Sequence, residues 1–140
     1  MNALKLKLQP AIPRSARIFG WILVLAGCFF AYVYTVTPGS FFPGVSISSY
    51  SEQFGLYSTG VRILGAVVGI LIALALNSAA LLALMLATRI FIEVGDVFVG
   101  LLINHGVPDT NTFTLLGLAA LELYFLVKLL NVISTSNKRD

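Results

Sequence analysis

Long apolar stretches alternate with short polar segments along the whole chain. Each stretch approaches or exceeds the roughly 20 residues that a helix needs to cross the hydrocarbon of a bilayer. A segment in lipid must also satisfy its backbone hydrogen bonds internally, as a helix does. The sequence therefore predicts an all-α, polytopic membrane protein, with a single domain over residues 1–140 that is a bundle of four transmembrane helices. We expect the spans at about residues 18–36, 57–76, 79–102 and 113–132.

The second and third stretches are almost continuous, and the polar pair Asn77-Ser78 separates them. One unbroken helix over residues 61–102 would be about 63 Å long at 1.5 Å per residue, about twice the hydrocarbon thickness. We therefore predict a tight helical hairpin that turns at Asn77-Ser78. Residues 37–57 mix Pro, Gly and Ser with apolar side chains, which predicts a long loop. That loop either lies on the membrane interface or is an ordinary exposed loop.

Composition agrees with a lipid environment. Hydrophobic residues make up 58% of the chain and charged residues only 11%, whereas soluble domains carry about 25% charged residues. The single cysteine, Cys28, excludes an internal disulfide and a multi-cysteine metal site. The net charge of +3 comes from cations that flank the first and last stretches, so it does not indicate a nucleic-acid partner.

The cations predict the orientation of the chain. Those outside the stretches are Lys5, Lys7, Arg14 and Arg17 before the first, and Lys138 and Arg139 after the last. Residues 37–57 and 103–111 contain no Lys or Arg. By the positive-inside rule, both termini are expected in the cytoplasm. The alternative, a signal peptide in the first stretch, is disfavoured because no small-residue cleavage site follows it.

Ionisable residues interrupt the apolar stretches. Apart from Lys128, which lies near a helix end and can reach the interface, they are Arg62, Arg89, Glu93, Asp96 and Glu122. Those of the third stretch are spaced i, i+4 and i+7, so they lie within about 60° of one another on one helix face. Ionisable residues at membrane depth face protein or water and often mark functional sites. These five residues are therefore the candidate ligand or proton site.

The charge count predicts how these residues pair. Two arginines face three carboxylates, and a buried acid without a cation stays protonated or binds a cation. We predict that Glu122 is this acid, because no basic residue lies one turn away on its own helix. Arg89 is expected to pair with Glu93 or Asp96 within its helix, or with Glu122 across the bundle. The cluster either only fixes the helix register, recognises a ligand or partner, or carries protons.

A small-residue motif, Gly65-x-x-x-Gly69, precedes the turn. Such a motif allows close approach of helix backbones, and Gly69 lies within about 20° of Arg62 on a helical wheel. We expect this face to pack against a neighbouring helix of the bundle, with a homodimer contact as the alternative.

No set of residues indicates catalysis. His105 is the only histidine and has no nucleophile beside it, and no Ser-His-Asp set, phosphate loop or metal-ligand cluster is present. The sequence therefore predicts no catalytic residue, no metal site and no cofactor, and it does not indicate an enzyme.

Two short motifs carry a family resemblance. They are Val61–Ala66 at the opening of the second stretch and Arg89-x-x-x-Glu93-x-Gly95-Asp96 in the third. Together with the basic start and the Pro/Gly loop, they resemble small four-helix bacterial membrane proteins of the DoxX-like type and related families of unknown function. The resemblance implies a bundle in the bacterial inner membrane, in a family sometimes associated with redox systems, and it supplies no shared catalytic residues.

The leading functional hypothesis is non-enzymatic. The protein would bind a lipid-soluble ligand, such as a lipid or quinone, or a partner subunit or second copy, through its polar intramembrane centre. One alternative is a proton-coupled or quinone-linked redox component of the membrane. The other is a structural accessory subunit of a larger membrane complex.

Overall fold

The computed structural model describes residues 10–37 and 49–137, and their regular structure is helical throughout. The helices are α1 (Arg14–Val36), α3 (Tyr50–Ala75), α4 (Ala79–Ile103) and α5 (Thr110–Asn137). The all-α prediction is therefore confirmed for this part of the chain. By length and composition, α1, α3 and α5 could each cross a membrane. Helix α4 has 25 residues, but with three ionisable side chains it is not among these candidate spans, so the predicted fourth span is not confirmed.

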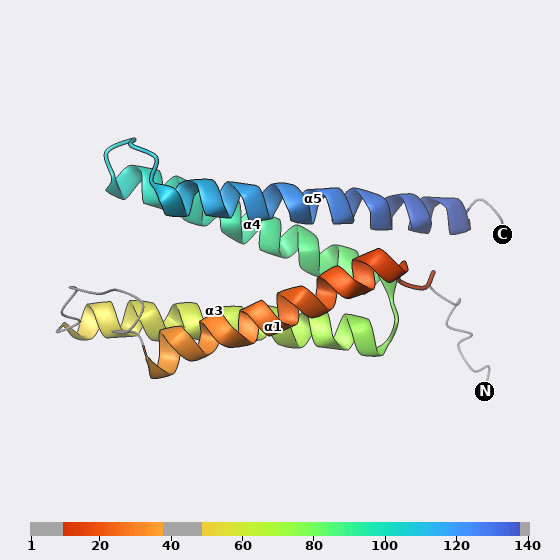
Figure 1. Cartoon of the computed structure of the whole chain (residues 1–140), viewed down its shortest axis with the longest axis horizontal. Coiled ribbons are helices and arrows are strands. Elements are labelled where there is room, and N and C mark those ends of the chain that lie inside the picture. The colour runs from red at the N-terminus through yellow and green to blue at the C-terminus, as the bar shows by residue number, and fades with distance from the viewer. Residues whose placement is uncertain (1–9, 38–48, 138–140) are drawn as a thin grey trace, which may run out of the picture.

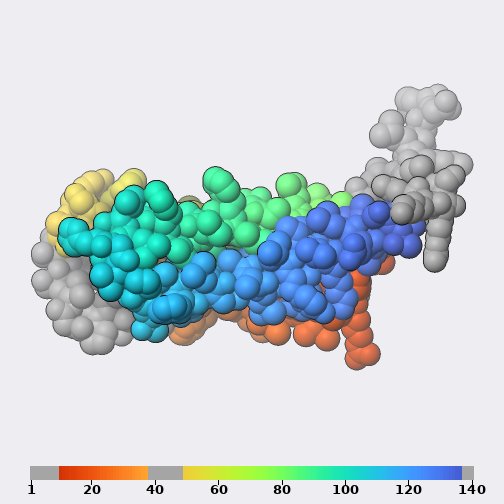
Figure 2. All heavy atoms as spheres, turned by 90° about the horizontal axis from the view of Figure 1, so that it is seen from above, coloured from red at the N-terminus to blue at the C-terminus, as the bar shows by residue number. Residues whose placement is uncertain are grey.

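The helices form two antiparallel pairs, α1 with α3 and α4 with α5 (Figure 1). The start of α1, the connection between α3 and α4, and the end of α5 lie at one end of the molecule, which we call the turn end (Figure 1). From there the two pairs diverge toward the opposite end, the loop end. Seen from above, α4 and α5 lie side by side and cover one face of an elongated molecule (Figure 2).

The α3–α4 turn lies where the sequence predicts it. Asn77 adopts a left-handed conformation with φ 49°, which asparagine tolerates better than most residues. Its Oδ1 accepts hydrogen bonds from the backbone N–H of Ile12, at 3.2 Å, and from the Arg17 guanidinium. Ser78 Oγ caps α4 by accepting from Leu81 N at 3.2 Å. The helices then diverge, so α3 and α4 share a turn but pack together less than the other two pairs.

All four helices meet in an apolar core at the turn end. The core takes residues from the first half of α1 and α4 and from the second half of α3 and α5, as an antiparallel arrangement requires. Phe19 of α1 stacks on Phe125 of α5 with ring centroids 4.2 Å apart. Ile70, Leu82 and Leu129 are fully buried between the helices. This core holds the two helix pairs together at the turn end.

Glycines allow close packing, but not in the way the motif predicts. A Cβ on Gly69 would collide with Met85 of α4, while a Cβ on Gly65 would meet open space. Gly69 and Arg62 therefore face the same neighbour, as expected, and Gly65 does not belong to that contact. The sequence reasoning missed Gly27 of α1, where a Cβ would collide with Val67 of α3.

Several helix boundaries differ from the prediction. Helix α3 begins at Tyr50 rather than residue 57, because Ser49 and Glu52 form a reciprocal capping box. The Ser-x-x-Glu spacing was visible in the sequence. The predicted loop is shorter for this reason, and residues 38–48, on which its place at the interface depends, lie outside the described residues. Helix α5 begins at Thr110 after the Asp109 cap, and it extends to Asn137.

Candidate functional site

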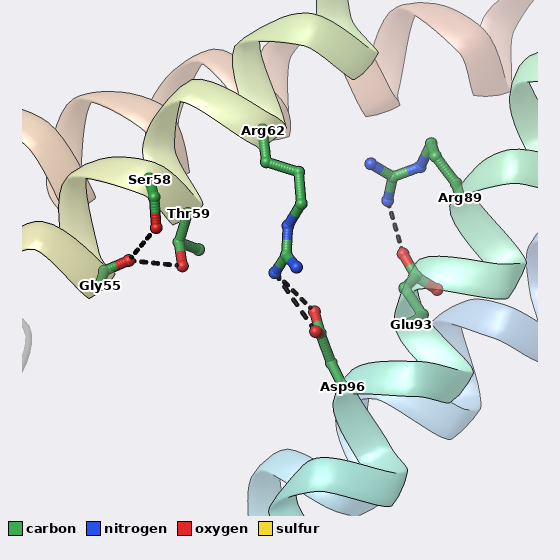
Figure 3. Close-up of polar contacts among 7 residues, drawn as sticks. All are labelled: Gly55, Ser58, Thr59, Arg62, Arg89, Glu93 and Asp96. Carbon is green, nitrogen blue, oxygen red and sulfur yellow. Dashed lines mark hydrogen bonds and ion pairs between the residues drawn. The ribbon is translucent and has the colours of Figure 1, made fainter.

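The five predicted site residues form two separate groups of ion pairs. Arg89 and Glu93 lie beside each other on α4, while Asp96 of the same helix meets Arg62 of α3 (Figure 3). The common helix face that the spacing predicts is therefore divided between two neighbours. One part contacts α5 and the other contacts α3.

The first group, which we call the buried triad, consists of Arg89, Glu93 and Glu122. Arg89 Nη2 donates to Glu93 Oε1 and Arg89 Nε donates to Glu122 Oε1, both at 2.6 Å. The side chains are 14%, 7% and 0% exposed, respectively. Two of the predicted pairings, Arg89 with Glu93 and Arg89 with Glu122, are thus confirmed. The triad ties α4 to α5 by charge-assisted hydrogen bonds.

The prediction that Glu122 has no cation was wrong. No basic residue lies one turn away on α5, but the cation comes from α4. The predicted excess of carboxylates over arginines is still present, because Arg89 pairs with both Glu93 and Glu122. If both were ionised, the triad would carry a net charge of −1.

The second oxygen of each glutamate lacks a partner. Glu93 Oε2 and Glu122 Oε2 are both buried and accept no hydrogen bond from the described residues. A buried polar atom without a hydrogen bond is costly, more so when it bears charge. In each glutamate, Oε1 therefore accepts from Arg89, while Oε2 is buried and accepts no hydrogen bond from the described residues.

The second group, which we call the Arg62–Asp96 bridge, connects α3 of one helix pair with α4 of the other (Figure 3). Arg62 Nη2 donates to Asp96 Oδ1 at 3.2 Å and to Oδ2 at 3.0 Å. The side chains are 46% and 38% exposed. The alternative in which Arg89 pairs with Asp96 is therefore not observed. This bridge is the accessible part of the polar centre.

Lys128 contributes a contact that the sequence reasoning missed. Its Nζ donates to Ser15 Oγ at the start of α1, at 2.9 Å. The ammonium group therefore makes a hydrogen bond within the protein at the turn end. The two residues are separated by 113 positions. Only the antiparallel bundle, which places the start of α1 beside the last turns of α5, could have suggested the pair.

Among the residues that the structure describes, the other polar side chains make local contacts and do not form a metal-binding group. His105 lies in the α4–α5 connection in a left-handed conformation with φ 52°. Asp109 Oδ1 accepts from the hydroxyl of Thr112, at 2.7 Å, and from its backbone N–H, at 2.8 Å. These bonds lower the pKa of Asp109. Within residues 10–37 and 49–137, no group of three or more His, Cys, Asp or Glu side chains could hold a metal ion.

Comparisons with protein-family models, curated proteins and solved structures gave no match for this chain. The resemblance to DoxX-like proteins therefore stays a prediction.

Proposed function

We propose that the chain is a four-span protein of the bacterial inner membrane, with α4 crossing the bilayer beside the three apolar helices. A charge at the centre of an isolated helix costs roughly 2.5–3.5 kcal/mol. In the bundle, the ionisable side chains of α4 are all engaged in ion pairs with one another or with neighbouring helices. The start of α1 and the end of α5 lie at one end (Figure 1). An even number of spans and the flanking cations then favour a cytoplasmic turn end.

This topology gives the two polar groups different depths. If the hydrocarbon begins at the α3–α4 turn, Arg89 lies about 16 Å into it and Asp96 about 27 Å, at 1.5 Å per residue. A hydrocarbon layer is about 30 Å thick. The buried triad then lies near the middle of the bilayer, and the Arg62–Asp96 bridge lies near its outer boundary.

Within this topology, the bridge is the proposed binding site for a lipid-soluble molecule with a hydrogen-bond acceptor oxygen, such as a lipid or a quinone. The observation that carries the proposal is that Arg62 is exposed and only partly hydrogen-bonded. Its side chain is 46% exposed on an apolar helix, and only its Nη2 donates to Asp96. The other nitrogens of the guanidinium can still donate to a carbonyl or phosphate oxygen. The buried triad is too enclosed to contact such a molecule directly.

The test is ligand retention. The full-length protein is released from membranes in mild detergent, and native mass spectrometry measures the fraction of chains that carry a lipid or quinone. An Arg62→Gln variant should retain about tenfold less, because a hydrogen bond to a charged group contributes about 1.5–3 kcal/mol and 1.4 kcal/mol corresponds to a factor of ten. An Arg14→Gln variant is the matched control, because Arg14 is also exposed but lies at the turn end.

Equal retention by the parent and the Arg62→Gln variant would refute the site. A protein that co-purifies at one copy per chain, and is lost with Arg62→Gln, would favour the accessory-subunit hypothesis instead. Retention that falls equally in both arginine variants would indicate nonspecific attraction of anionic lipid.

A further inference from the structure

The buried triad contains more acid than base. Glu93 of α4 and Glu122 of α5 converge on one guanidinium, that of Arg89. Their Oε1 atoms each lie 2.6 Å from a nitrogen of that guanidinium, which holds the two carboxyl groups close to each other. Like charges held this close in a buried site cannot both remain ionised without a second positive charge.

Other charged groups do not supply that second charge. Arg62 of α3 is engaged with Asp96, and Asp96 adds a further negative charge near Glu93. Lys128 of α5 lies six residues beyond Glu122, about 9 Å along the helix, and donates to Ser15. Neither cation therefore pairs with the triad, and its excess negative charge is not offset from α3 or α5.

From α1, the neighbouring contact is apolar. Phe19 stacks on Phe125, one turn after Glu122. Together with the burial of Glu122, which is 0% exposed, this ring pair separates the triad from the polar groups of the turn end. A counter-charge must bind at the triad itself.

The unpartnered oxygens mark the place for it. Glu93 Oε2 and Glu122 Oε2 are buried and accept no hydrogen bond from the described residues, and both side chains are more than nine-tenths buried. We propose that Glu93 and Glu122 form a proton-binding site in the middle of the membrane and share a single proton between them. The proton cancels the excess charge, and a protonated carboxyl group can donate to the other carboxylate. Exchange proceeds through Glu93, the more exposed of the two.

The depth of this site in the membrane rests on the proposed four-span topology, but the shared proton does not depend on a ligand at Arg62. This proposal differs from the interpretation of Glu122 as an isolated neutral acid, because the proton here follows from two acids sharing one arginine. Removing either acid leaves one carboxylate and one guanidinium, which balance without a proton. Each single variant should therefore lose the protonated state altogether.

Infrared spectroscopy of the full chain in lipid vesicles tests the proposal at neutral pH. The chain has only three glutamates, Glu52, Glu93 and Glu122, so isotope-labelled glutamate in a Glu52→Gln background reports on the triad alone. Gln can replace Glu in the capping box that Glu52 forms. We expect the C=O band of one protonated glutamic acid per chain, with a shift in D2O. Glu93→Gln and Glu122→Gln should each abolish it.

Three results would overturn the proposal. The band could be missing from the chain with both acids, which would mean that both are ionised. It could persist in Glu93→Gln, which would mean that burial alone protonates Glu122. It could also appear only when choline replaces sodium and potassium, which would mean that an alkali cation occupies the site. The first and third results need no triad variant, so the proposal can be refuted even if a Gln variant does not fold.

Discussion

Replacement of Arg89 by leucine should destabilise the folded bundle strongly. The substitution removes two hydrogen-bonded ion pairs of 2.6 Å whose carboxylates are 7% and 0% exposed. Leaving one buried charge without its partner typically costs about 3–5 kcal/mol. If Glu93 and Glu122 already share a proton, only one negative charge is stranded, so we expect a loss of about 3–5 kcal/mol rather than twice that value.

The assay is a reversible titration from mild detergent into a denaturing one, followed by the fluorescence of Trp21, the single tryptophan. Arg62→Leu is the comparison variant, because its ion pair is 46% and 38% exposed and lies near the outer boundary in the proposed topology. Asp96 left without Arg62 can reach interfacial water, so the loss should be smaller than for Arg89→Leu. Adding Glu93→Gln and Glu122→Gln to Arg89→Leu should recover part of the loss. The reasoning is refuted if Arg89→Leu is as stable as the parent, or if both leucine variants lose the same amount.

Two further predictions concern packing and capping. Gly69→Leu should separate α3 from α4 and lower thermal stability in detergent, whereas Gly65→Leu should not, because a Cβ at Gly65 meets open space; equal effects would contradict the contact. Asp109→Ala should lower the melting temperature at pH 7. Since hydrogen bonding lowers the pKa of folded Asp109, the carboxylate stabilises the fold above its ordinary pKa of about 3.9. That contribution is lost as the pH falls through the lower folded value, so the difference from the parent should shrink in acid.

The helices and the turn could be predicted because their signals are local. An apolar run reports a span wherever its neighbours lie, and Asn77-Ser78 was the polar break in an otherwise continuous run. The early start of α3 at Tyr50 was also a local signal, because the capping spacing of Ser49 and Glu52 is present in the sequence. It was missed because the span was measured from hydropathy alone.

The arrangement of the site was only partly predictable. The i, i+4 spacing of Arg89 and Glu93 fixes their contact within one helix. The partners of Glu122 and Asp96 depend instead on which helix packs against which face of α4, and a single sequence carries no signal for that choice. The same holds for Lys128 and Ser15. Charge counting predicted the excess acid, but three-dimensional packing decided which residues share it.

The depth of α4 tests the four-span topology most directly. A nitroxide label at Ala87, an exposed position on α4, would lie about 14 Å beyond the turn. With Cys28→Ala as background, its accessibility to oxygen and to a water-soluble nickel chelate is measured in vesicles. We expect high oxygen and low nickel accessibility, equal to a label at Leu121 on the apolar helix α5 and opposite to one at Val107 in the α4–α5 connection. Nickel accessibility at Ala87 as high as at Val107 would place α4 outside the bilayer and contradict the four-span topology.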